Sequence, residues 1–293
     1  MMKRNKYLSI INKGTSKMIH WLKIDIETEG DVKAPFFTGS MLRGVLGYAL
    51  KRVVCINPSY KCEGCFAADE CLFYRFYEAK NIFHPYRLGI TLQPNSLDFS
   101  FYLFEDAVVS LPYVLSVIQK ALEEIGVGKE KRKVKIKMIR VGEQIVYDGE
   151  NFLSLKGIEN KTLEIDTFCQ DVTLNFTMPI RIKENNTFAR EQFSLHTLIG
   201  NIHSRYRQLK GLPPERLGYR VYGEIVKSSL KFVEMQRYSS RQKSGMNMGG
   251  LKGQMTIIGL DKQSYVYLKI GEIIGAGKQT VFGLGSYEIK GAC

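Results

Sequence analysis

The sequence predicts an α+β protein built from two tandem ferredoxin-like (RRM-like) βαββαβ domains. Strands of alternating apolar residues and amphipathic helices follow one another in the order β-α-β-β-α-β, and this order occurs twice along the 293 residues. A split βαβ unit of this order closes a four-stranded antiparallel sheet with both helices on one face. We therefore assign residues 1–155 to a first domain and residues 156–293 to a second.

The first domain contains six predicted elements, and its helices have recognisable ends. Thr38 or Ser40 caps the start of the first helix, and Gly126 ends the second. The elements are a strand at 20–26, a helix at 40–53, strands at 87–92 and 97–104, a helix at 111–125 and a strand at 133–140.

The second domain repeats the six elements after a polar connection. They are a strand at 172–178, a helix at 191–209, strands at 230–238 and 250–258, a helix at 265–274 and a strand at 285–289. The recurrence of the complete order is explained most simply by two copies of one module.

Composition narrows the class of function. The formal net charge is +13 and 44% of the residues are hydrophobic. No apolar run reaches the ~18 residues of a membrane span, and no secretory signal is evident, so we expect a cytoplasmic protein with no membrane partner. A basic excess of this size attracts polyphosphates, which makes nucleic acid the first partner to consider, the alternative being a basic solvated surface.

An insertion over residues 55–71 of the first domain contains Cys55, Cys62, Cys65 and Cys71. The Cys-x2-Cys pair lets two thiolates of one turn share a metal, and the flanking pair completes a tetrahedral shell. The pattern predicts a structural zinc site, with an iron–sulfur cluster or disulfides as alternatives. A closed four-thiolate site leaves no position for water, so we expect it to stabilise a loop and not to catalyse.

A glycine-rich loop closes the second domain. Gly275, Gly277 and Lys278 are followed by Gly283 and Gly285. So many positions without a Cβ indicate either close approach by another molecule, which in a basic protein is an anion, or a tight helix-to-strand connection with packing glycines. The loop is not a P-loop, because no G-x-x-x-x-G-K-[ST] occurs.

The candidate acid and base lie on the 191–209 helix. His196, His203 and Arg207 share one stripe of it, opposite the apolar stripe, and form a possible base, acid and phosphate clamp if that stripe faces RNA. The alternative is a solvated polar face. His20, which fits a packing role, and His84, in a predicted loop, are the remaining histidines.

A basic segment joins two strands of the second domain. It contains Arg237, Tyr238, Arg241 and Lys243 with flanking glycines. Such donors hold phosphates and a tyrosine ring stacks on an unpaired base, whereas the alternative is a long solvated hairpin.

Four motifs occur in one chain: Pro35-Phe36 with Gly39-Ser40 and Leu42-Arg43-Gly44, the cysteine loop, Arg237 to Gln242 with Gly249-Gly250, and Gly275-Ala-Gly277-Lys with Gly283-Leu-Gly285. Together they resemble the RAMP superfamily of CRISPR systems, specifically the Cas endoribonucleases that cut precursor CRISPR RNA within its repeats.

The resemblance implies two ferredoxin-like modules and a cleavage that needs no metal. A ribose 2′-hydroxyl attacks the adjacent phosphate and leaves a cyclic phosphate and a 5′-hydroxyl. CRISPR repeat RNA is then the partner, with other Cas effector subunits as further partners. Many relatives carry a histidine on the first helix, whereas residues 38–53 of this chain contain none.

The site assignment combines the resemblance with the residues. We expect His203 as base or acid with His196 as its partner, and Arg241 and Lys243 near the scissile phosphate. Tyr238 is the next catalytic candidate, followed by His20 and His84. Further RNA contacts are expected from Arg43, Arg207, Arg237, Lys278 and the glycines at 275 and 277.

Two other functions remain open on the sequence alone. One is a RAMP subunit that binds guide RNA in an effector complex without cutting it. The other is a zinc-containing DNA-binding regulator, although no helix-turn-helix or repeated finger spacing is present.

Overall fold

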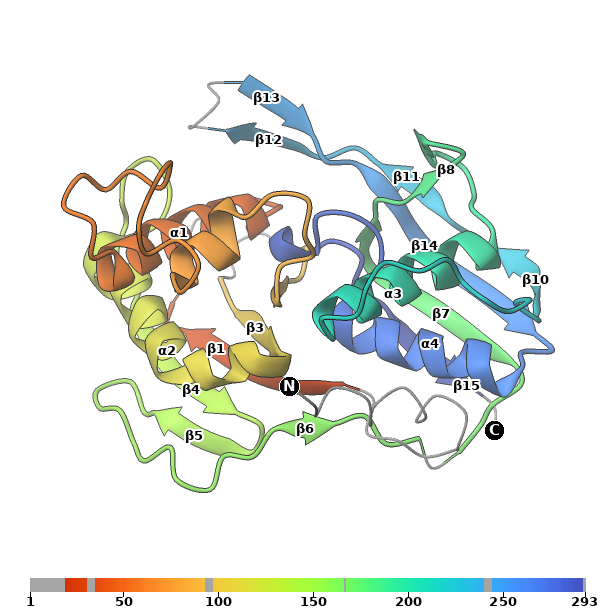
Figure 1. Ribbon diagram of the computed structural model, residues 1–293, viewed down its shortest axis with the longest axis horizontal. Helices are drawn as coiled ribbons and strands as arrows, with labels where there is room; N and C mark the ends of the chain where they lie inside the picture. Colours follow the sequence, from red (N-terminus) through yellow and green to blue (C-terminus); the bar gives the residue numbers. More distant parts are fainter. Residues whose placement is uncertain (1–18, 31–34, 93–96, 166, 240–243, 292–293) are drawn as a thin grey trace, which may run out of the picture.

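The computed structural model describes residues 19–30, 35–92, 97–165, 167–239 and 244–291 (Figure 1). Two α+β modules lie side by side, each with a sheet and two main helices. Of the helices in these ranges, none has both the length and the apolar character needed to span a bilayer.

The first sheet has the strand order β2-β3-β1-β4-β5, and the short strand β6 pairs with β1 at one end. The bounds are β1 His20–Thr28, β2 Tyr86–Gly89, β3 Phe99–Phe104, β4 Ile136–Val141, β5 Gln144–Tyr147 and β6 Lys161–Thr162. Leu22, Ile24 and Ile26 of β1 are buried, as expected when alternate residues of a strand point to one face.

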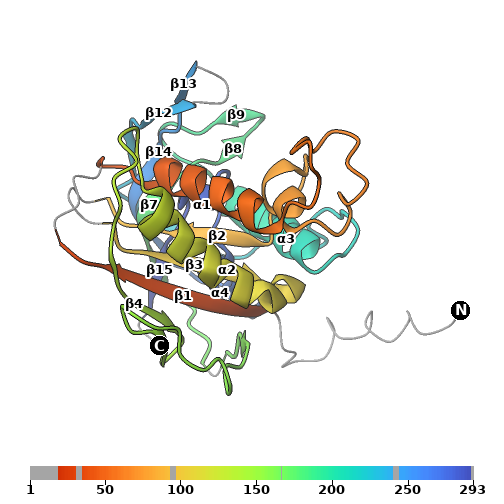
Figure 2. The same cartoon turned by 90° about the vertical axis from the view of Figure 1, so that its left-hand side faces the viewer.

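Two helices cover the buried face of the first sheet. Figure 2 shows α1 (Gly39–Val54) and α2 (Leu111–Gln119) side by side across it. A 3-10 turn, η2 (Glu105–Ser110), leads into α2, and a π-helical turn, η3 (Lys120–Ile125), continues it to Gly126. Gly126 has a φ of +83°, a conformation that glycine adopts without strain, so the predicted stop is confirmed. A further π-helical turn, η1 (Tyr74–Glu78), follows the cysteine loop.

The second sheet has the strand order β10-β14-β7-β15, with β11 also paired to β14. The bounds are β7 Val172–Ile180, β10 Glu224–Ser228, β11 Lys231–Val233, β14 Gly250–Ile258 and β15 Glu288–Gly291. The helices α3 (Leu195–Leu209) and α4 (Lys262–Ile274) pack against each other on this sheet. Ser194 caps α3 by accepting from the Thr197 amide at 3.1 Å, and Asp261 caps α4.

Both sheets place the first strand of their unit between the third and the fourth. This is the arrangement that a βαββαβ unit requires, because each crossover helix joins parallel strands that are separated by one antiparallel neighbour. The prediction of two tandem ferredoxin-like modules is confirmed.

The predicted strand at 230–238 is divided in the structure. Lys231–Val233 (β11) stays in the sheet, but Gln236–Ser239 (β12) pairs with Ser244–Asn247 (β13) in a separate hairpin that projects from the second sheet on the side of α1 (Figure 1). The strand β10 was not predicted. It is an edge strand with mostly exposed residues, so it lacks the alternation by which strands are recognised. The small hairpin β8 (Lys183–Glu184) with β9 (Thr187–Phe188) was not predicted either.

The two modules share their hydrophobic cores. Val281, Phe282 and Leu284, close to the end of the chain, belong to the core of the first module, and Ile19 and Phe104 belong to that of the second. β6 also pairs with β1 although it lies beyond the predicted boundary at residue 155. The second module therefore docks on the first through its glycine-rich loop, and the chain leaves the first sheet a few residues later than expected.

Candidate functional site

The glycine-rich loop fastens the two modules together. It contains η4 (Thr280–Phe282), a single 3-10 turn that contacts both β2 and α1. A Cβ on Gly39, the first residue of α1, would lie 1.9 Å from the carbonyl oxygen of Phe282, and one on Gly285 would lie 1.7 Å from that of Ala276. These glycines permit close packing of two backbones. For Gly285, the tight connection with packing glycines is therefore the reading of the glycine-rich loop that the structure supports.

Gly275 and Gly277 do not present free amides to a phosphate. Both are buried, with φ values of +77° and +79°. The Gly275 amide donates to the Gly271 carbonyl at 2.8 Å, and the Gly277 amide donates to the Asn201 side chain at 2.7 Å. The expectation that the two glycines contact RNA directly is therefore not supported by their positions. Lys278, between this turn and η4, is exposed.

Arg43 projects from α1 between two aromatic rings. Its guanidinium carbon lies 4.7 Å from the Tyr77 ring centroid and 4.8 Å from that of Phe282. The Tyr77 ring fits against α1 because residue 47 is a glycine, where a Cβ would lie 2.5 Å from the ring. Burial holds the pKa of the Tyr77 phenol well above its ordinary range, so the hydroxyl remains a neutral donor at physiological pH.

His84 lies beside this arrangement in the loop of residues 79–85. Its Nδ1 is 3.1 Å from the Arg75 carbonyl oxygen, which can only accept, so Nδ1 carries the proton and Nε2 keeps its lone pair in the neutral ring. Burial lowers the pKa of His84 below its ordinary value of 6.5, the carbonyl contact opposes this, and Arg43 and Arg205 lower the pKa further. A partly exposed, neutral imidazole near physiological pH is suited to accept a proton.

Loop 79–85 is held by α3 of the second module. The Phe83 amide donates to the Gln208 side chain, whose Nε2 donates to the Asn81 carbonyl at 3.5 Å. The guanidinium carbon of Arg205 and the ammonium nitrogen of Lys278 lie 5.3 and 5.5 Å from the Phe83 ring centroid.

The residues of this region come from four separate segments of the chain. We call them the junction cluster: Arg43, Tyr77, Phe83, His84, Arg205 and Lys278. Sequence patterns had selected Arg43 and Lys278 as RNA contacts. Arg205 was not selected, although a signal was present, because an arginine at this position continues the apolar stripe of Leu198, Ile202 and Leu209.

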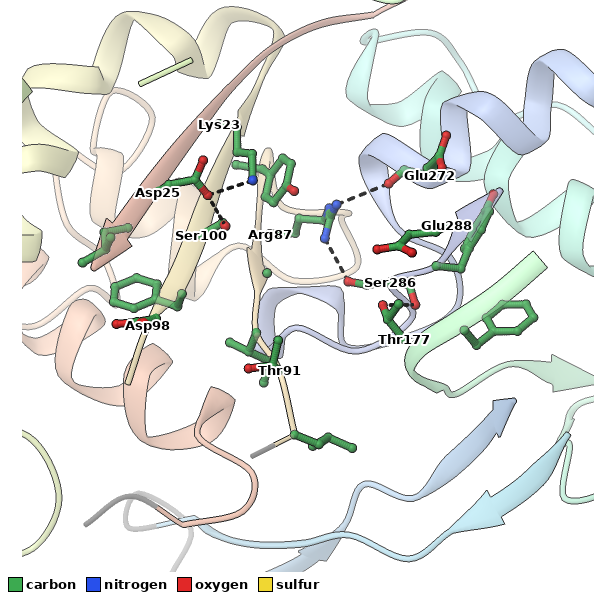
Figure 3. Close-up of a pocket in the computed structure, with 18 of the residues that line it drawn as sticks. Lys23, Asp25, Arg87, Thr91, Asp98, Ser100, Thr177, Glu272, Ser286 and Glu288 are labelled. Atoms are coloured by element: carbon green, nitrogen blue, oxygen red, sulfur yellow. Dashed lines mark hydrogen bonds and ion pairs between the residues drawn. The ribbon is translucent and has the colours of Figure 1, made fainter. Parts of the chain in front are cut away.

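Apart from the junction cluster, a cavity of about 1010 Å³ lies between the two sheets (Figure 3). Two of the basic side chains that line it are paired with acids. Lys23 lies 2.8 Å from Asp25, and Arg140 lies 3.6 Å from Glu27. Since those ammonium and guanidinium groups are already neutralised, we consider the junction cluster the better place for a phosphate.

Arg87 ties β2 to the end of α4 beside this cavity. It donates to the Ile273 carbonyl at 2.6 Å, the Ser286 hydroxyl at 2.9 Å and the Glu272 carbonyl at 3.3 Å. These contacts satisfy carbonyls at a helix C-terminus, where a cation is favoured (Figure 3). Arg87 is thus a structural link between the modules.

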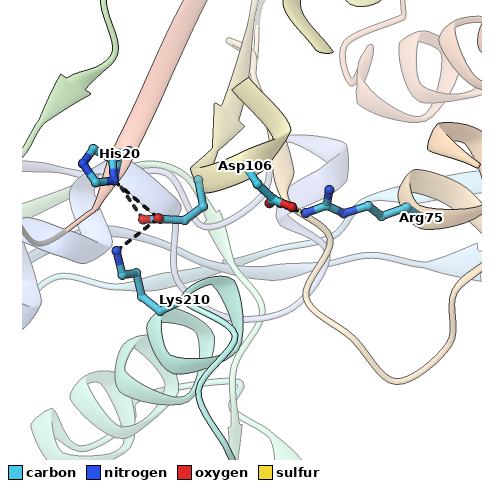
Figure 4. Close-up of polar contacts among 5 residues, drawn as sticks. His20, Arg75, Asp106 and Lys210 are labelled. Carbon is cyan, nitrogen blue, oxygen red and sulfur yellow. Dashed lines mark hydrogen bonds and ion pairs between the residues drawn. The ribbon is translucent and has the colours of Figure 1, made fainter. Parts of the chain in front are cut away.

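A second link involves His20, as Figure 4 shows. Glu105 accepts from the His20 amide at 3.0 Å and lies 3.5 Å from the His20 ring, and it also pairs with Lys210 of the second module at 3.1 Å. Arg75 and Asp106 form a separate ion pair nearby. His20 therefore has a carboxylate partner in a contact that holds the end of α3 to the first module.

The predicted orientation of His203 is wrong. Its side chain is only 6% exposed and meets the Tyr267 ring edge-on, with centroids 5.5 Å apart. The segment after α3 folds back along the helix, where Pro213 and Glu215 contact Arg207, and its Tyr219 stacks on Tyr267 with centroids 6.1 Å apart. Burial and the nearby Arg207 lower the pKa of His203, and Glu215 opposes them.

The other two members of that stripe do not join His203 in an open site. His196 is exposed near the start of α3. Arg207 donates to the Pro213 carbonyl at 2.9 Å and pairs with Glu215 at 2.7 Å, with its side chain 12% exposed. Arg207 therefore anchors the segment that follows α3, and the expected grouping of base, acid and clamp is not formed.

The basic hairpin carries the remaining candidates. Arg237 and Tyr238 lie on β12, which pairs with β13, while Arg241 and Lys243 fall outside the described residues. Their roles stay predictions, because only the backbone of β12 and β13 is described.

The four cysteines lie in a turn-rich loop between α1 and η1. Cys62 and Cys71 pack against the first core, and all four are free thiols. Within the described ranges, no three His, Cys, Asp or Glu side chains gather closely enough to hold a metal ion. This arrangement does not fit a four-thiolate centre, and the zinc site stays a prediction that the metal content of the purified protein tests.

Two family models match the chain. Residues 17–161 match an N-terminal domain family, AF_1859_N, and residues 174–287 match the family of the CRISPR-associated endoribonuclease Cas6. A protein of Archaeoglobus fulgidus, described as uncharacterized, is 24% identical over 278 residues, which are 87% of this chain and 92% of that protein.

Solved structures share the fold at low identity. Cas6 of Thermus thermophilus aligns in its product complex with a TM-score of 0.55 and 12% identity, over 94% of this chain and all of that one. A partial Cas6-RT-Cas1–Cas2 complex aligns with a TM-score of 0.51 and 12% identity, over 94% of this chain and 46% of that chain. The likeness covers both modules, so the arrangement of the two sheets is the shared feature.

Proposed function

This chain is a member of the Cas6 family of CRISPR-associated RAMP proteins, and from that membership we propose that it cuts precursor CRISPR RNA within its repeats. The family is one of endoribonucleases, and RNA is a substrate that matches a net charge of +13. The junction cluster, where a poised histidine lies among cations at the meeting of the two modules, is the observation that supports the proposal most.

The reaction we propose needs no metal ion. The 2′-hydroxyl oxygen of one ribose forms a bond to the adjacent phosphorus while the bond from that phosphorus to the 5′-oxygen breaks. A base takes the 2′-hydroxyl proton, an acid supplies a proton to the leaving 5′-oxygen, and cations stabilise the negative charge that develops on the phosphate oxygens. The products are a cyclic phosphate and a 5′-hydroxyl.

We assign the base to His84 in place of His203. Its free Nε2, its lowered pKa and its partial exposure suit proton abstraction, whereas His203 is enclosed by Tyr267 and its neighbours. Residues 38–53 lack the histidine that relatives carry on the first helix. His84 lies within electrostatic reach of Arg43 on that helix, so the loop supplies the imidazole that the helix does not.

The remaining groups have supporting roles in this proposal. Arg43 and Lys278 hold the phosphate and stabilise its developing charge, while Tyr77 positions the Arg43 guanidinium through its ring. The hairpin of β12 and β13, with its basic residues, guides the RNA on the second module.

The test is to incubate the purified protein with its repeat RNA in chelator. We expect one cut that leaves a 5′-hydroxyl and a cyclic phosphate, and we expect a 2′-deoxyribose at the cut position to prevent it while binding is retained. If the folded protein binds the repeat RNA but leaves it uncut, the result would instead indicate a guide-binding subunit of an effector complex. Cleavage that stops in chelator would contradict the metal-free mechanism.

A further inference from the structure

Two arginines are almost fully buried where the modules meet, and they differ in how their hydrogen bonds are satisfied. Arg87 is 4% exposed and donates to two carbonyls at the end of α4 and to the Ser286 hydroxyl. Arg205, on α3, is 2% exposed. Among the residues that the structure describes, the Nε and Nη2 of Arg205 have no hydrogen-bond partner.

An unpartnered guanidinium in such a position is unfavourable. A buried charge without acceptors loses its hydration and gains nothing in exchange, which is why buried arginines are normally paired. Burial, and then repulsion by Arg87, lower the pKa of Arg205 to about 9. The free protein thus keeps in its interior a guanidinium that has a ring contact with Phe83 but no acceptor for its Nε and Nη2.

The unpartnered atoms have the geometry of an anion site. Nε and Nη2 lie along one edge of the planar guanidinium, and that edge matches two oxygens of a phosphate. Carboxylates can be matched in the same way, but none within the described ranges accepts from Nε or Nη2 of Arg205.

Phe83 lies over Arg205 and borders the exposed part of the junction cluster. Its ring centroid is 5.3 Å from the Arg205 guanidinium and 5.5 Å from the Lys278 ammonium, and it belongs to the same loop as His84. Phe83 itself is only partly buried. A rotation of this one side chain would open Arg205 toward the surface where Lys278 lies.

We propose that Arg205 is a phosphate-binding residue that Phe83 covers in the free protein, and that an RNA phosphate displaces the ring and pairs with Nε and Nη2. This inference rests on the proposed function, since the phosphate belongs to the repeat RNA held at the junction cluster. Arg205 is a positioning residue: it fixes the backbone next to His84, and the proton transfers belong to other groups.

The experiment compares Arg205→Met and Arg205→Lys with Arg216→Met, which removes the same charge from an exposed position after α3. The first measurement is the melting temperature without RNA. Because Arg205→Met removes a buried charge whose Nε and Nη2 have no acceptor, we expect it to melt at the same temperature as the wild type or higher. The second is stabilisation by inorganic pyrophosphate, which we expect in the wild type and Arg216→Met, and not in Arg205→Met.

The third measurement is affinity for repeat RNA with a 2′-deoxyribose at the cut position, over a range of salt. We expect Arg205→Met to bind about 10- to 100-fold more weakly and to lower the salt slope by about 0.7, with Arg205→Lys in between. Arg216→Met should retain the wild-type affinity. Phe83→Ala should lower the pyrophosphate concentration needed for stabilisation.

The outcomes separate the two proposals. If Arg205→Met melts well below the wild type and its folded fraction binds RNA normally, Arg205 is a structural residue and the inference is overturned even where RNA cleavage is observed. If pyrophosphate stabilises the wild type and Arg205→Met equally, the inference fails in the same way. If the wild type neither binds nor cuts repeat RNA but needs Arg205 for stabilisation by pyrophosphate, the proposed function fails and the anion site remains.

Discussion

Among single residues, His84 is the proposed base of the cleavage reaction. Its Nδ1 donates to the Arg75 carbonyl, and its surroundings disfavour the imidazolium. We predict that His84→Ala lowers the single-turnover rate of repeat RNA cleavage by about 10²- to 10⁴-fold while RNA affinity is retained.

The pH dependence of cleavage follows from the lowered pKa of His84. The active base is the neutral ring, so its rate contribution is complete above that pKa and is lost as the pH falls through it, below the ordinary 6.5. Replacing Arg43 by methionine removes a nearby positive charge, so the pKa of His84 rises and the acid limb of the profile moves to higher pH.

Two histidines of α3 serve as controls for this prediction. His203→Ala removes a buried ring that packs on Tyr267, so we expect a lower melting temperature and a normal rate at temperatures where the protein is folded. His196→Ala, at an exposed position, should change neither. A normal rate for His84→Ala, or the loss of cleavage in folded His203→Ala, would contradict the assignment.

The sequence predicted some residues of the site and not others. Arg43 and Lys278 could be selected because charged residues next to glycines of recognisable motifs stand out locally. His84 was named last among the catalytic candidates because Arg43 and Arg205, which lie near it in the structure, are far away along the chain. Helical geometry placed His203 on a polar face, but it cannot show that the segment carrying Tyr219 folds back over that face.

At the scale of elements, the glycine-rich loop and α1 control how the modules dock. Gly39→Ala would force a Cβ to within 1.9 Å of the Phe282 carbonyl oxygen, a backbone atom that cannot move aside cheaply. We predict a loss of about 2–4 kcal/mol of unfolding free energy, measured by chemical denaturation.

The same helix offers a matched control. At Gly44 a Cβ would meet nothing within 4 Å, so Gly44→Ala should stabilise the protein by about 0.5–1 kcal/mol through helix propensity alone. Equal effects of the two substitutions would refute the close docking of η4 on α1.

Element order was predictable and element edges were not. The buried alternation of β1 and β7 marks both strands clearly, since each faces a core on one side. β10 lacks such a side because most of its residues are exposed, and no break in the sequence pattern marks where β11 leaves the sheet and β12 begins within the strand expected at 230–238.

At the scale of the whole molecule, the site exists only because the modules are joined. Arg87 links β2 to α4, Glu105 links His20 to Lys210, and Val281 and Phe282 enter the first core. These contacts bring α3 and the glycine-rich loop against loop 79–85. The sequence could indicate two modules and a basic surface, but the docking depends on contacts between distant segments, which carry no periodic signal.

The central claim is that the scissile phosphate lies at the junction cluster and not in the cavity between the sheets. The most direct measurement is photo-crosslinking with repeat RNA that carries 4-thiouridine beside the cut position and a 2′-deoxyribose at it. We predict crosslinked peptides from residues 79–86 and 275–282. Crosslinks confined to β1 and β3, which line the cavity between the sheets, would contradict the account.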